Sequence, residues 1–110
     1  MENTELRAEL RAAVTRRGAL TAGTESFPCV VQDMSDSGML IICTRPLIVG
    51  QTLHFKCDLF PEKTLECMIE IVHISEDGAG TKIIEIDEQG AKLIQLFLQE
   101  HFTDNVKRWV

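Results

Sequence analysis

The sequence has 110 residues and a mass of 12.4 kDa, the size of one domain, so we expect a single domain over 1–110. Its 45% hydrophobic and 25% charged residues exclude a long disordered chain, and the longest apolar run, residues 39–43, is far shorter than the ~20 residues of a membrane span. The net charge of −6 and the acidic first residues, without an apolar stretch, argue against a nucleic-acid partner and a secretory signal, so we expect a cytoplasmic protein without membrane insertion.

The N-terminal part is basic and differs from the rest of the chain. Residues 4–14 have the apolar spacing of a short amphipathic helix, or they form an arm. Four of the eleven Lys and Arg residues lie in the first seventeen, whereas eleven of the seventeen acidic residues lie between Asp58 and Asp104. We therefore expect a basic arm over 1–17 on an acidic body, which suits a small anion better than a polymer.

Short apolar runs separated by turn residues follow this arm. Alternation and β-branched residues predict strands, and the final segment has a helical apolar face with Asp87 as its N-cap. The expected strands are 14–21, 27–32, 38–44, 51–60, 64–74 and 81–86, and the helix is 88–102. Six short strands indicate an antiparallel barrel or sandwich, and the helix covers an open end. We place the barrel at 18–86 and the helical region at 87–103.

No pattern of an enzyme or a metal site is present in the sequence. The nucleophile, zinc-protease, phosphate-loop and dinucleotide motifs are all absent. The four cysteines form no Cys-x-x-Cys pair, and the three histidines have no metal-ligand spacing to them. We expect buried, reduced thiols, no metal, no cofactor and no catalytic activity.

Two short motifs carry chemistry. Arg7 and Arg11 are four residues apart, which places both on one face of a helix or of an extended segment, and guanidinium groups bind phosphate and stack on purines. The segment 33–38 reads Asp-x-Ser-x-x-Gly, in which Asp33 and Ser35 favour a tight turn and Gly38 allows close backbone approach. Alone, each motif is also typical of a solvated surface or an ordinary hairpin turn.

Together, the motifs resemble the PilZ domain, the bacterial receptor of cyclic di-GMP (c-di-GMP). The arginine pair is followed after 21 residues by Asp-x-Ser-x-x-Gly, and residues 47–53 and 80–83 also resemble segments of the family. The resemblance implies a mainly β fold: a six-stranded antiparallel barrel with an N-terminal arm or short helix and a C-terminal helix.

The resemblance also implies the binding residues. Arg7 and Arg11 would contact guanine and phosphate groups of c-di-GMP, while Asp33 and Ser35 would contact guanine or order the arginines. Gly38 would serve the backbone shape of the turn. Possible supporting contacts come from three further residues, Arg16, Arg17 and Met34. Arg16 and Arg17 are also an alternative choice for the arginines of the basic motif, in place of Arg7 and Arg11.

We therefore expect a c-di-GMP receptor that signals through an unidentified protein effector after the nucleotide orders the arm. The alternative is an adaptor of the same fold that binds its protein partner without nucleotide. Binding of single-stranded nucleic acid is disfavoured, because the body is acidic and the sequence has no Tyr and one Trp for base stacking.

Overall fold

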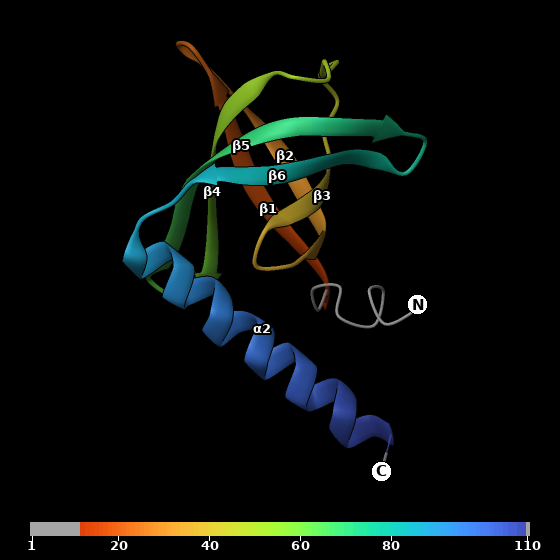
Figure 1. Ribbon diagram of the computed structural model, residues 1–110, viewed down its shortest axis with the longest axis vertical. Coiled ribbons are helices and arrows are strands. Elements are labelled where there is room, and N and C mark those ends of the chain that lie inside the picture. Colours follow the sequence, from red (N-terminus) through yellow and green to blue (C-terminus); the bar gives the residue numbers. More distant parts are fainter. Residues whose placement is uncertain (1–11, 110) are drawn as a thin grey trace, which may run out of the picture.

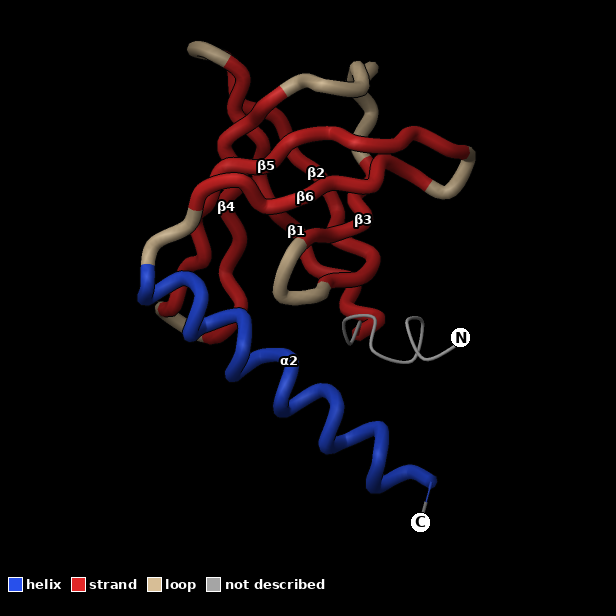
Figure 2. Tube along the Cα trace, viewed as in Figure 1, coloured by secondary structure: helices blue, strands red, loops and turns tan. Residues whose placement is uncertain are grey.

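The computed structural model describes the backbone of residues 12–109 and the side chains of residues 12–101. Arg7 and Arg11 therefore lie outside the described residues. The chain forms six strands and a C-terminal helix (Figures 1 and 2). Their bounds are β1 Ala12–Ala22, β2 Glu25–Met34, β3 Gly38–Ile42, β4 Thr52–Phe60, β5 Lys63–Ser75, β6 Gly78–Glu85 and α2 Glu88–Trp109.

The six strands close into one antiparallel barrel. Their order around it is β1-β2-β3-β6-β5-β4, and β1 pairs with both β2 and β4. The expected six-stranded antiparallel barrel with a C-terminal helix is thus confirmed. Closure leaves hydrogen-bonded neighbours on both sides of each strand, which a sandwich with open edges would not provide.

The core is built by strict alternation along the central strands. In β4 the buried side chains are Leu53, Phe55, Cys57 and Leu59, and in β5 they are Leu65, Cys67, Ile69 and Ile71. Intervening residues such as Lys56 and Glu66 are exposed. This is the alternation that the sequence predicted, and it places three of the four cysteines in the barrel interior as small apolar side chains.

Strand β1 begins earlier than expected. Residues 12–14 are strand rather than helix, and residues 12–17 belong to the barrel rather than to an arm that extends to residue 17. Pairing with β2 explains the difference, because Ala12 lies opposite Met34 and Arg17 opposite Val30. Between Ala13 and Arg16 the register shifts, and Thr15 has a φ of 55°, so a bulge interrupts the pairing here.

The helix α2 covers one end of the barrel with its first half (Figure 1). Asp87 caps it, since its Oδ1 accepts a hydrogen bond of 2.7 Å from the Gly90 amide. Ile94 and Phe97 are buried against the core, as the apolar face predicted. The helix continues to Trp109, beyond the expected end at residue 102 or 103. Within the described residues, no helix combines the length and apolarity needed to cross a membrane.

Candidate ligand-binding site

The second motif lies where β2 ends, turns and returns as β3. Asp33 and Met34 are the last residues of β2, Ser35–Ser37 form the turn, and Gly38 begins β3. The expected strand over 27–32 was therefore too short, because Asp33 and Met34 pair both with β1 and with β3. The motif is a hairpin corner at the end of the barrel near α2 (Figure 1).

A bulge in β2 decides which way Asp33 faces. Phe27, Cys29 and Val31 are buried at every second position, and continued alternation would bury residue 33 next. Instead the register to β3 shifts between Val31 and Asp33, and Met34 takes the next buried position. The extra residue, Gln32, thereby moves the Asp33 carboxylate out of the apolar core to a half-buried place at the rim.

The buried side chain of Ser35 holds the turn together through hydrogen bonds to its backbone. Its side chain is fully buried, and its Oγ accepts hydrogen bonds of 3.2 Å from the amides of Ser37 and Gly38. The Ser35 amide donates to the Gly38 carbonyl at 2.9 Å. These contacts make the turn a compact unit that holds Asp33 at one side and Asp36 at its exposed tip.

Gly38 allows the turn to join the neighbouring strand β6. It lies opposite Lys82, and a Cβ at this position would overlap the carbonyl oxygen of Thr81. The buried Thr81 hydroxyl accepts from the Met39 amide at 3.2 Å and donates to the Met39 carbonyl at 3.0 Å. Ile83 adds an amide hydrogen bond of 2.7 Å to the Ser37 carbonyl.

Thr81 and Lys82 were not singled out in the sequence. Thr81 fixes the start of β3, and Lys82 places an exposed cation opposite Gly38, beside a turn that otherwise carries carboxylates. Their place depends on strand pairing across more than forty residues. The one available signal in the sequence is the resemblance of residues 80–83 to a segment of the PilZ family.

The three possible supporting residues, Met34, Arg16 and Arg17, lie in different environments. Met34 is fully buried and packs in the core beneath the turn. Arg16 directs its guanidinium over the Phe97 ring of α2, 5.3 Å from the ring centre, and Arg17 is exposed on β1. The structure therefore brings Asp33, Ser35 and Gly38 together, while Arg16 contacts the helix.

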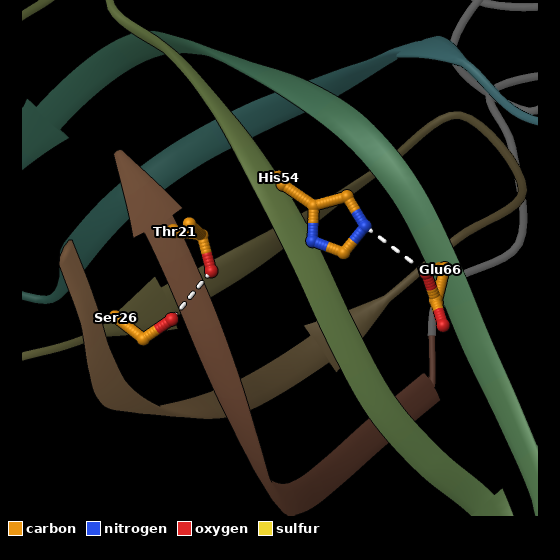
Figure 3. Close-up of polar contacts among 4 residues, drawn as sticks. All are labelled: Thr21, Ser26, His54 and Glu66. Atoms are coloured by element: carbon orange, nitrogen blue, oxygen red, sulfur yellow. Dashed lines mark hydrogen bonds and ion pairs between the residues drawn. The ribbon is translucent and has the colours of Figure 1, made fainter. Parts of the chain in front are cut away.

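Other polar contacts on the barrel join neighbouring strands. Figure 3 shows two of them on the outer surface: Thr21 with Ser26 at 2.7 Å, and His54 Nε2 with Glu66 Oε1 at 3.1 Å. All four side chains lie along paired strands. Within the described part of the chain, no cluster of three or more His, Cys, Asp or Glu side chains is arranged to hold a metal ion.

Comparison with known proteins identifies related chains. The family model described as PilZ domain matches residues 5–100, a range that includes both motifs. No curated protein matches the sequence. The inhibitor of motility of Bacillus subtilis (MotI/DgrA) is similar in structure, with a TM-score of 0.73 and 14% identity over 88% of this chain and 52% of that chain.

Two structures from Escherichia coli are also similar. YcgR in complex with c-di-GMP has a TM-score of 0.75 and 14% identity, over 93% of this chain and 48% of that chain. The PilZ domain of YcgR with c-di-GMP has a TM-score of 0.73 and 10% identity, over 93% of this chain and 95% of that chain. The chain thus spans about half the length of the Bacillus protein and of YcgR. At these identities the likeness to solved structures concerns the fold.

Proposed function

Because the chain belongs to the PilZ domain family, whose members are non-catalytic and typically bind c-di-GMP, we propose that it is a c-di-GMP receptor. Its binding residues are Arg7, Arg11, Asp33, Ser35 and Gly38. The nucleotide lies across the hairpin corner at the end of β2, between this corner and the N-terminal residues.

The observation that carries the proposal is the pairing of β1 with the end of β2. Ala13 lies opposite Asp33, and Ala12, the residue that follows Arg11 in the sequence, lies opposite Met34. The basic motif therefore leads directly into the strand that borders the Asp33 corner. This register supports one site made from two motifs that are 21 residues apart in the sequence.

The chemistry of the ligand fits these residues. Cyclic di-GMP has two phosphate groups and two guanines, so it needs positive charge, stacking partners and hydrogen-bond acceptors. Arg7 and Arg11 supply charge and planar guanidinium faces, and the Asp33 carboxylate accepts from guanine N–H groups or orders an arginine. Ser35 and Gly38 hold the corner that presents Asp33, and Arg17 is a supporting cation on the neighbouring strand.

In this proposal the signal leaves through a protein effector. Binding orders the N-terminal residues against the barrel and changes the surface offered to the partner. The opposite end of the barrel has exposed aliphatic side chains, among them Ile48 at 70% and Val49 at 58% exposure. Exposed aliphatic side chains favour contact with a protein partner. They are equally compatible with a second candidate function, that of an adaptor that binds its partner without nucleotide.

Calorimetric titration of c-di-GMP into the wild type and Arg11→Ala tests the proposal. One charge-assisted contact contributes on the order of 1.5–3 kcal/mol, so we expect binding roughly 10–100-fold weaker in the variant. Arg45→Ala is the matched control. Arg45 contacts Glu25 at the start of β2, and Met34 at its end is nine residue steps of strand, roughly 30 Å, from Glu25.

The control should bind like the wild type. The receptor proposal would be contradicted if the folded wild type gave no heat of binding at several temperatures. It would also be contradicted if Arg45→Ala lost as much affinity for c-di-GMP as Arg11→Ala. In that case a partner isolated with the wild type should bind Arg11→Ala equally well, as the nucleotide-independent adaptor requires.

A further inference from the structure

Two cysteines directly continue the paired residues at the far end of the β2–β3 hairpin. Val31 pairs with Ile41 and Val30 with Ile42, so continuing the antiparallel register by one residue brings Cys29 opposite Cys43. Directly opposed residues have Cα atoms about 4.5–5.5 Å apart, within the range of about 4.4–6.8 Å that a disulfide bridges.

Both side chains are on the inner side of the hairpin. Cys29 is buried, as are Val31 and Ile41, whereas Ile42 faces outward. Cys43 is half-buried and packs against the same core, and its thiol donates to the Arg45 carbonyl at 3.3 Å. The sulfur of Cys29 lies beside Gly18 on the β1 side of β2, so formation of a bond to Cys43 requires it to rotate about the Cα–Cβ bond towards β3.

The two thiols differ in access. Cys43 lines an open pocket of about 360 Å³, bordered by Ile42, Leu47 and Ile74, so a small oxidant reaches it from solvent. Burial, with smaller contributions from the thiols of Cys43 and Cys57, raises the pKa of Cys29 to about 12. Cys43 is therefore the first thiol to react, and Cys29 is the second.

We propose that Cys29 and Cys43 are an oxidation site, which hydrogen peroxide converts into a disulfide across β2 and β3. The Cys43 sulfur attacks the peroxide O–O bond and becomes a sulfenic acid, with release of one water. The Cys29 sulfur then attacks the Cys43 sulfur, the S–O bond breaks, and the sulfenic hydroxyl leaves with the Cys29 proton as a second water. Peroxide is reduced, and the two thiols together lose two electrons.

Register argues against two other pairings, Cys29 with Cys57 and Cys57 with Cys67. Cys29 and Cys57 both lie opposite Gly18, on the two sides of β1, so two strand spacings, about 9.5 Å, separate them. Cys57 is opposite Leu65, whereas Cys67 is opposite Phe55, which makes their relation diagonal at about 7–8 Å. Of the three pairs compared, Cys29 and Cys43 are thus the one that the continued register brings within bonding reach.

The disulfide would close a ring that contains the whole Asp33–Gly38 corner. The ring runs from Cys29 to Cys43, about 15 residues, and restricts the unfolded chain much more than the folded hairpin. We expect the melting temperature to rise by roughly 5–10 °C on oxidation and to return on reduction. This proposal does not depend on nucleotide binding.

Peroxide treatment of the full chain, followed by digestion with Asp-N and trypsin and by mass spectrometry, tests the proposal. Cleavage before Asp33 and Asp36 and after Lys56 releases Cys29 and Cys43 in separate peptides, neither of which contains Cys57. We expect the linked pair of peptides, lighter by two hydrogen atoms than their sum and separated by reductant.

The wild-type digest decides the outcome even if a variant fails to fold. Oxidised Cys43 without a link, a link to Cys57 or Cys67, or unchanged thiols would each overturn the proposal. Cys43→Ser should remove both the link and the rise in melting temperature, and Cys67→Ser should retain both.

Discussion

Gly38 shows how a single residue sets the distance between two strands at the candidate site. Its φ is not in the left-handed region, so the requirement for glycine is one of space. The backbone of Thr81 and Lys82 occupies the place where a Cβ would lie. The sequence motif predicted a glycine that shapes the backbone, and the structure identifies β6 as the reason.

Gly38→Ala should destabilise the protein by about 1–3 kcal/mol, because β3 must move away from β6 to admit the methyl group. Gly80→Ala is the matched control in the same pair of strands, since its nearest neighbour is the Cβ of His73 at 3.6 Å, an ordinary contact. We expect it to be neutral or slightly stabilising. Urea denaturation measures both, and equal effects would contradict the steric explanation.

At the scale of elements, local pattern predicted most of the barrel. Residues 52–60 and 63–71 alternate between apolar and polar side chains, and both segments are strands with the expected inner faces. Asp33-x-Ser35-x-x-Gly38 was identified because a turn forms from neighbouring residues and its signal is local.

The bulge in β2 could not be predicted from the same pattern. Its position at Gln32 follows from the register with β3, and that register is not encoded within β2 itself. The places of Thr81 and Lys82 also required the pairing of β3 with β6. The sequence therefore predicted the turn at the candidate site, but not the neighbouring residues of β6 that hold it.

The turn at Ser35 has a counterpart elsewhere, which allows a controlled experiment. Ser75 at the β5–β6 turn accepts from the Asp77 amide at 3.2 Å and contacts the Gly78 carbonyl at 3.5 Å, but it is exposed. Ser35→Ala leaves the buried Gly38 amide and the part-buried Ser37 amide without their acceptor and should cost about 1–3 kcal/mol. Ser75→Ala should cost less than about 0.5 kcal/mol, because water replaces the hydroxyl.

The free energy of unfolding of the two alanine variants measures this difference. A similar loss in both would show that the buried hydrogen bonds of Ser35 are not the source of stability. Because the turn carries Asp33, weaker nucleotide binding in Ser35→Ala at a temperature where the protein remains folded would further support its role in the proposed site.

At the scale of the whole molecule, the interior of the barrel couples stability to alkaline pH. Burial raises the pKa of Cys29 and Cys67 from 9.0 to about 12 and that of Cys57 to about 11. Between pH 9 and 11 the unfolded chain loses these protons while the folded barrel retains them. The stability that the neutral thiols contribute is therefore complete below pH 9 and falls as the pH rises.

We expect the urea midpoint of the reduced protein to decrease steadily above about pH 9. One thiol contributes at most about 1.4 kcal/mol per pH unit, and solvent screening lowers this limit. Cys67→Ala removes one of the three buried thiols, so its stability should fall less steeply, by up to about a third. The sequence has no tyrosine, so no phenol titrates in this range, and an unchanged slope in Cys67→Ala would assign the alkaline loss to groups outside the core.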